Sequence, residues 1–141
     1  MRETALAALI LIAGCGEPKA AAKRVELKTV GPGAIELVPR AGQLPYCLVL
    51  TVAESGVVRQ LTPLAPNEAI ECPAGAPIGG VTYRLPRAEG AVRVHVIFAD
   101  RRIDGRPVAA QVRELGASRQ FTAMDLRAPG NVALESLTVQ P

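Results

Sequence analysis

Short, valine-rich apolar segments follow one another from Arg24 to the end of the chain, separated by Gly, Pro, Asn and Asp. This pattern favours a mainly β domain, because an amphipathic helix needs a longer run with a period near 3.6 residues. Tyr46–Ala53 is apolar at both odd and even positions, which is typical of a central strand covered on both faces. Glu54-Ser55-Gly56 then predicts a tight turn, and residues 57–61 its partner strand.

The segment 91–99 predicts a strand whose first part has two different faces, because residues 92–96 alternate between apolar and polar. Arg93 and His95 lie on one face, which we expect to meet solvent. The other face is expected to join the central strand in a single core that contains Val92, Val94, Val96 and Phe98 together with Leu48 and Leu50.

Further strands are predicted at residues 24–30, 34–38, 69–72, 80–85, 120–126 and 132–139. In the last of these the apolar parity changes halfway, which predicts a β-bulge near Glu135 and Ser136. Residues 107–115 alone have helical periodicity, with Pro107 suited to the first turn and Gly116 to the end. About eight or nine strands with one short helix predict a single antiparallel β-sandwich domain over residues 24–141, with a partly open β-barrel as the alternative.

The first fifteen residues have a different character. Met1-Arg2-Glu3-Thr4 is followed by an apolar run over residues 5–13 and then by Gly14-Cys15. A short charged start, a short apolar run and small residues are the layout of a secretory signal peptide. The run is well below the ~20 residues that a membrane-spanning helix needs. We therefore expect a signal peptide over residues 1–14.

Ile12-Ala13-Gly14-Cys15 resembles the lipobox of bacterial lipoproteins. The resemblance implies cleavage before Cys15 and attachment of lipid chains to that cysteine, and two or more chains anchor a protein stably. Residues 15–23 would then be the lipidated cysteine and a polar tether. Gly16 is not the aspartate that signals retention in the inner membrane, so the resemblance implies the outer membrane. The alternative is a buried amino-terminal helix, which the Pro18-containing polar segment disfavours.

A looser resemblance concerns the folded part of the chain. Residues 48–63 and 89–100 are similar to uncharacterised β domains of bacterial envelope lipoproteins, with a returning strand that ends in Leu-Thr-Pro and a strand of the form Val-His-Val-Ile-Phe-Ala-Asp. This resemblance implies no catalytic residues.

Export would place the domain where thiols oxidise. Without the lipidated Cys15, only Cys47 and Cys72 remain, and they can form one intramolecular disulfide. They lie near the start of one predicted strand and at the end of another, so they could meet at one end of the sandwich. The alternative is two buried free thiols that act as small hydrophobic side chains.

The residues that could support chemistry are few. His95 is the single histidine, and no serine lies in a Gly-x-Ser-x-Gly motif. Cys47 and Cys72 lack the close partners of a zinc site, and the glycine pairs do not form a nucleotide-binding loop, so we expect neither a metal nor a cofactor. The net charge of +3 comes from dispersed residues, and only four aromatic residues are present. Nucleic-acid binding is therefore not expected.

A charged loop lies between the predicted strand 91–99 and the helix. Its charged residues are Asp100, Arg101, Arg102, Asp104 and Arg106. The simpler interpretation is a solvated connector in which Asp104 helps to begin the helix. The alternative is a partner-binding loop whose arginines bind carboxylates or phosphates of another envelope component.

Two functional hypotheses follow. The first is a membrane-anchored, non-catalytic envelope module that binds or scaffolds an envelope protein or an anionic envelope component. The second is a small envelope hydrolase in which His95 acts together with Asp100 or Asp104.

Overall fold

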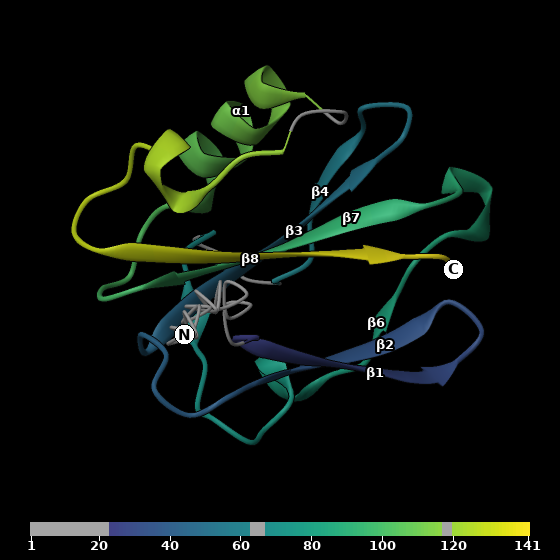
Figure 1. Cartoon of the computed structure of the whole chain (residues 1–141), viewed down its shortest axis with the longest axis horizontal. Helices are drawn as coiled ribbons and strands as arrows, with labels where there is room; N and C mark the ends of the chain where they lie inside the picture. Colours follow the sequence, from purple (N-terminus) through teal and green to yellow (C-terminus); the bar gives the residue numbers. More distant parts are fainter. Residues whose placement is uncertain (1–22, 63–66, 117–119) are drawn as a thin grey trace, which may run out of the picture.

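The computed structural model describes residues 23–62, 67–116 and 120–141, and this part of the chain contains eight strands in two antiparallel sheets (Figure 1). The strands are β1 (Val25–Gly31), β2 (Ala34–Pro39), β3 (Tyr46–Ala53), β4 (Val58–Gln60), β5 (Ile70–Glu71), β6 (Tyr83–Arg84), β7 (Val92–Ala99) and β8 (Val132–Val139). The smaller sheet has the order β1-β2-β6; the larger has the order β4-β3-β7-β8, and β5 also pairs with β3. The prediction of a mainly β, sandwich-like domain is confirmed, because the two sheets remain separate.

Helical structure is limited to α1 (Gly105–Leu115) and three short 3₁₀ turns, η1 (Ile78–Gly80), η2 (Arg87–Glu89) and η3 (Ala123–Asp125), in the described residues. The predicted helix is confirmed, although it begins two residues earlier than expected. Asp104 is its N-cap and accepts a hydrogen bond from the Arg106 backbone N–H at 2.9 Å. Gly116 ends it with φ +78°, which a glycine adopts without strain. None of the described helices is long and apolar enough to cross a membrane.

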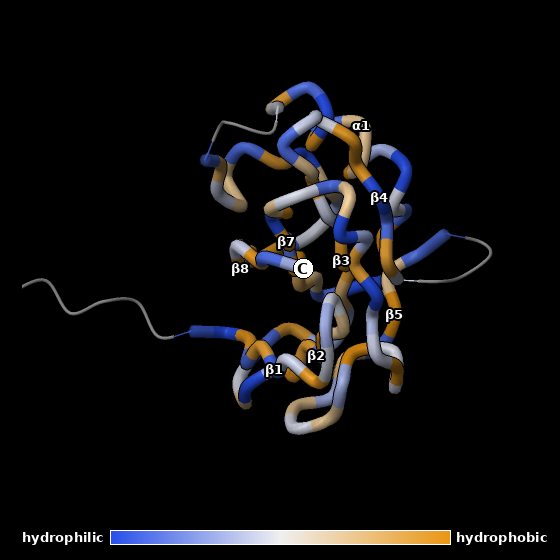
Figure 2. Tube along the Cα trace, turned by 90° about the vertical axis from the view of Figure 1, so that its right-hand side faces the viewer, coloured by the Kyte–Doolittle hydropathy of each residue, from blue (hydrophilic) through white to orange (hydrophobic). Residues whose placement is uncertain are grey.

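The larger sheet is the middle of three layers, because the smaller sheet covers one of its faces and α1 covers the other (Figures 1 and 2). We call the apolar cluster between the sheets the inter-sheet core; it contains Val49 and Val94. We call the cluster beneath α1 the helix-side core; it contains Leu50 and Val112. Burial on both faces explains why β3 is apolar at every position.

The expectation of a single core was wrong. Val92, Val94, Val96 and Phe98 lie in the inter-sheet core, as expected, but Leu48 and Leu50 lie in the helix-side core. The register explains the difference, because Val49 pairs with Val96, and Leu48 pairs with Ile97 on the opposite face. Alternation within a strand separates its two faces, but it does not say which face of the neighbouring strand each one joins.

The predicted bulge in β8 is also absent. β8 pairs with β7 in one continuous register, from Val132 opposite Ala99 to Val139 opposite Val92. The parity change has another cause: Leu134 packs against the helix-side core, whereas Leu137 packs against the inter-sheet core. The larger apolar residues of the first half, Val132 and Leu134, therefore pack on the helix-side core, and those of the second half, Leu137 and Val139, pack in the inter-sheet core.

Residues 120–126 do not form the predicted strand. The Thr122 hydroxyl accepts a hydrogen bond from the Met124 N–H, and the Asp125 carboxylate accepts one from the Thr122 N–H, at 3.3 and 2.8 Å. This reciprocal capping box begins η3 and turns the chain out of the extended conformation. Phe121 and Leu126, on either side of the turn, are buried in the helix-side core.

The predicted hairpin is confirmed, since β3 and β4 pair on either side of a turn in which Gly56 has φ +88°. The segments predicted as strands at 69–72 and 80–85 contain β5 and β6, of two residues each. In β6, the buried Tyr83 hydroxyl donates a hydrogen bond to the Ile78 carbonyl at 3.0 Å, and burial raises the Tyr83 pKa to about 12. This bond holds η1 against the smaller sheet.

Two connections tie separate parts of the fold together. The structure joins Cys47 and Cys72 in a disulfide, as expected, with 5.9 Å between the α-carbons. At the β8 edge of the larger sheet, the Glu135 carboxylate accepts hydrogen bonds from the backbone N–H groups of Arg24 and Val25, both at 2.6 Å. The start of β1 in the smaller sheet is thereby attached to the edge of the larger one.

Candidate functional site

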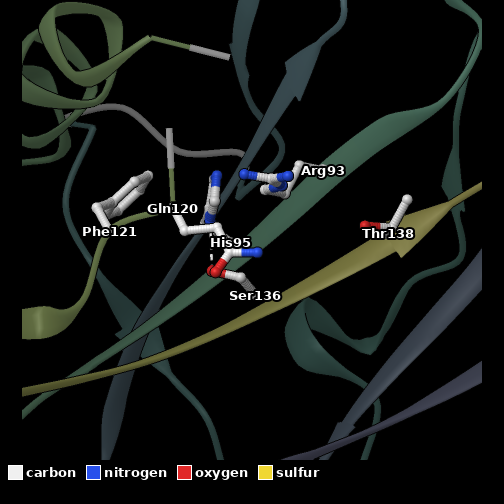
Figure 3. A pocket seen from close by; sticks show the side chains of 6 residues that line it. All are labelled: Arg93, His95, Gln120, Phe121, Ser136 and Thr138. Carbon is white, nitrogen blue, oxygen red and sulfur yellow. Dashed lines mark hydrogen bonds between the residues drawn. The ribbon is translucent and has the colours of Figure 1, made fainter. Parts of the chain in front are cut away.

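The candidate site is a pocket of about 250 Å³ on the helix side of the larger sheet (Figure 3). Two cross-strand pairs of β7 and β8 form its base: Arg93 lies opposite Thr138, and His95 lies opposite Ser136. Because side chains two residues apart on a strand share a face, these four groups lie side by side. Gln120 and Phe121, which precede η3, complete the lining.

The prediction that His95 faces solvent was wrong, because only 2% of the residue is exposed. Its face of β7 was expected to be the wet face of a two-layer sandwich. Phe121 covers it instead, with the centres of the two rings 4.5 Å apart. Figure 3 shows the imidazole between Phe121 on one side and Arg93 on the other.

His95 is neutral at pH 7. Burial, the larger cause, and the positive charge of Arg93 together lower its pKa from 6.5 to about 4. The imidazole Nδ1 forms a hydrogen bond with Ser136 Oγ at 2.8 Å. In a neutral imidazole this nitrogen either donates to the hydroxyl or accepts from it, depending on the tautomer.

The mouth of the pocket is polar. Ser136, Thr138 and Gln120 are exposed, and Arg93 is half-buried beside them. The pocket therefore combines one guanidinium, two hydroxyls, one amide and one neutral imidazole with the ring of Phe121. Aspartate and glutamate are absent from the described residues that line it.

The charged loop after β7 contains paired groups. Asp100 forms an ion pair with Arg101 at 3.0 Å, and the hydrogen bond from Arg101 is the main cause of the lowered Asp100 pKa. Asp104, besides capping α1, pairs with Arg106 at 3.1 Å, and hydrogen bonds from Arg106 lower its pKa. These contacts agree with the connector interpretation of the loop.

Arg102 belongs to the same loop but contacts other elements. It pairs with Glu71 of β5 at 3.2 Å, and its guanidinium lies 5.1 Å from the centre of the Tyr46 ring. Each arginine predicted for a partner-binding loop thus has an acidic neighbour within the domain.

The structure does not join His95 to the acidic residues expected to assist it. Asp100 follows β7 five residues after His95, a separation of roughly 16 Å along an extended strand. Asp104 is held at the start of α1 by its contacts with Arg106. The side chain that forms a hydrogen bond with His95 is instead Ser136, which the sequence did not predict as a site residue.

Cys15, the residue predicted to carry the lipid, lies outside the described residues. No group of three or more His, Cys, Asp or Glu side chains that could hold a metal ion occurs in the part of the chain that the structure describes.

Sequence reasoning missed Gln120, Phe121, Ser136 and Thr138. The shared parity of Ser136 and Thr138 was a signal, but their pairing with His95 and Arg93 depends on the strand order.

Acidification should destabilise the domain through His95. The unfolded chain binds a proton near pH 6.5, whereas the folded state binds it only near pH 4. The loss of stability therefore begins below pH 6.5 and is complete below about pH 4, where it amounts to about 3 kcal/mol. Denaturant unfolding of the wild type and of His95→Gln at pH 7, 5.5 and 4 measures it. Equal pH dependence in the two proteins would contradict the assignment.

The chain matches no protein-family model, and comparison with curated proteins and with solved structures finds no similar protein.

Proposed function

We propose that this protein is an exported lipoprotein, anchored to the outer membrane through Cys15, that acts as a non-catalytic binding or scaffolding module of the bacterial envelope. The lipobox-like ending Ile12-Ala13-Gly14-Cys15 after a short apolar run supports the anchoring. Residues 16–23 would tether the β-sandwich domain to the lipid. The partner is another component of the envelope.

The observation that carries the non-catalytic role is the composition of the pocket around His95. In a serine hydrolase a carboxylate orients the histidine and stabilises the imidazolium that forms during catalysis. Here the nearby charge is the guanidinium of Arg93, which opposes protonation of His95. A histidine with a pKa of about 4 is also a weak base at neutral pH. The pocket is suited to hold a ligand rather than to transfer protons.

The anchoring is tested by metabolic labelling with radioactive palmitate in a bacterial host. The wild type should incorporate the label, and Cys15→Ser should not, because the thiol is the acceptor. Gly16→Ser changes the next residue while keeping Cys15, so it is the matched control and should remain labelled. Equal labelling of the wild type and Cys15→Ser would contradict the lipoprotein assignment.

A small envelope hydrolase is the second candidate, and the 2.8 Å contact between His95 Nδ1 and Ser136 Oγ favours it. A fluorophosphonate probe, which reacts with activated serines, separates the two candidates. Our proposal predicts no labelling of the wild type. Ser55→Ala, in an exposed turn, is the control variant. Labelling that persists in Ser55→Ala but disappears in Ser136→Ala would contradict the binding module and support the hydrolase.

A further inference from the structure

The two sheets end at neighbouring edges on one side of the domain: β1 is the last strand of the smaller sheet, and β8 is the last strand of the larger one (Figures 1 and 2). The Glu135 carboxylate connects these edges, because it accepts the hydrogen bonds from Arg24 and Val25 at the start of β1. Beside this contact lies a groove of about 380 Å³. We call it the edge groove; its lining includes Leu27 of β1, Leu137 of β8 and the charged residues Lys23, Glu26 and Arg40.

The floor of the edge groove is apolar. Leu27 and Leu137 are partly buried, and they pack against the inter-sheet core from β1 and β8. An apolar side chain of another molecule that entered the groove would contact both leucines at the border of this core. Such a contact removes apolar surface from water and is therefore favourable.

The backbone of β8 is the second feature of this edge. A strand with one antiparallel neighbour leaves the N–H and C=O groups of alternate residues unpaired on its outer side. β8 pairs with β7 over all eight of its residues, and it contains none of the devices that usually protect such an edge, namely a lysine, a proline or a bulge. Its one charged side chain, Glu135, contacts β1. The edge therefore favours a partner in the extended conformation.

The charges around the groove specify the sign of the partner. Lys23 and Arg40 are exposed, and the ion pairs formed among the described residues do not include either of them. Glu26 is the one acidic residue among the described residues that line the groove. The balance is positive, which favours carboxylate side chains in whatever binds there.

We infer that the edge groove binds an extended, acidic segment of a partner protein. The segment pairs with β8 as an added strand, places an apolar side chain between Leu27 and Leu137, and places acidic side chains beside Lys23 and Arg40. Main-chain hydrogen bonds then provide affinity and alternate side chains provide specificity. This inference rests on the proposed function, because it specifies the class of partner that the module binds.

A second copy of the chain fits this edge less well. Its own β8 would offer an extended backbone, but the one acidic residue of that strand, Glu135, already accepts two hydrogen bonds from the start of β1. No other carboxylate of β8 would meet Lys23 and Arg40. Charge complementarity therefore favours a different, acidic protein.

The probes are three blocked peptides as long as β8. Valine alternates with glutamate in the first, valine with lysine in the second, and serine with glutamate in the third. Each peptide is titrated into the isotope-labelled full chain in detergent, and the backbone amide NMR signals report binding. The valine–glutamate peptide should shift the signals of β8 and β1. The other two should bind at least about tenfold more weakly, because one reverses the charge and the other lacks the apolar side chains.

Hydrogen exchange identifies the strand pairing. Backbone hydrogen bonds from β8 to the bound valine–glutamate peptide should slow the exchange of every second amide of β8, those that face away from β7. A peptide held by charge alone would leave these amides as exchangeable as in the free protein.

Charge-reversal variants locate the acidic contacts. Lys23→Glu combined with Arg40→Glu should reverse the preference, so that the valine–lysine peptide binds more tightly than the valine–glutamate peptide. Arg84→Glu combined with Arg87→Glu is the matched control, because it changes the charge equally at exposed residues in and after β6, at the other edge of the smaller sheet. Thermal unfolding shows whether both proteins are folded. If the groove variant does not fold, the three peptides on the wild type still decide the question.

Four results would overturn the inference: no shift with the valine–glutamate peptide at about 1 mM, equal binding of the three peptides, binding without slower exchange in β8, or an unchanged preference in the folded groove variant. Slow exchange of β8 that increases with protein concentration in the absence of peptide would assign the edge to a second copy instead. None of these results depends on palmitate or fluorophosphonate labelling, so failure of the inference and failure of the proposed function are distinguishable.

Discussion

Replacing Val94 with aspartate should prevent the domain from folding. Val94 is fully buried at the centre of β7, and its cross-strand neighbours are Thr51 of β3 and Leu137 of β8. The substitution would place a carboxylate in the inter-sheet core. Burying an unpaired charge costs several kcal/mol, which is comparable with the ~5–15 kcal/mol stability of a whole domain.

Circular dichroism and thermal unfolding measure this effect. Val30→Asp is the matched control, because it makes the same chemical change at a position of β1 that is 52% exposed. The control should retain a cooperative transition close to that of the wild type, within about 0.5 kcal/mol. A Val94→Asp protein that unfolds at the wild-type temperature would show that the placement of β7 between the two cores is incorrect.

Loss of the disulfide should be the second large effect. Cys47 and Cys72 are separated by 25 positions, and closing a loop of this length stabilises the folded state by about 3.5 kcal/mol in the chain-entropy estimate. Both residues are buried in the inter-sheet core, so the bridge also connects β3 with the segment after β5. Cys47→Ser combined with Cys72→Ser should therefore lower the free energy of unfolding by about this amount.

Denaturant unfolding of the oxidised wild type, the reduced wild type and the double variant separates two causes. Reduction breaks the bridge without changing a residue, so the reduced protein controls for the polar serines introduced into the core. Intact mass before and after alkylation under non-reducing conditions establishes the bridge itself. Two alkylatable thiols from Cys47 and Cys72 in the folded oxidised protein, with no two-hydrogen mass deficit, would refute it.

Much of the local structure could be predicted from the sequence, since it depends on neighbouring residues. The hairpin of β3 and β4 follows from an apolar run and a glycine turn, and the start of α1 follows from Asp104 as its N-cap. The valine face of β7 follows from the alternation over residues 92–96. In these cases the physical cause lies within about ten residues of the chain.

The errors share a different cause. His95 was expected in solvent, Leu50 in the same core as Val94, and a bulge near Glu135, yet none of these holds. Each expectation assumed a single apolar core on one face of β7 and β8. A third layer, formed by α1 and the segment around η3, packs on the opposite face and adds a second core there.

By itself, the sequence determined that this chain forms a mainly β domain with one capped helix, because alternation, turn residues and caps act over short distances. Only the tertiary structure decided the site. The contact of His95 with Ser136 and the position of Arg93 beside Thr138 depend on the pairing of β7 with β8 across more than thirty intervening residues. That pairing is decided by the burial of two apolar faces at once, a property of the packed layers that no single segment contains.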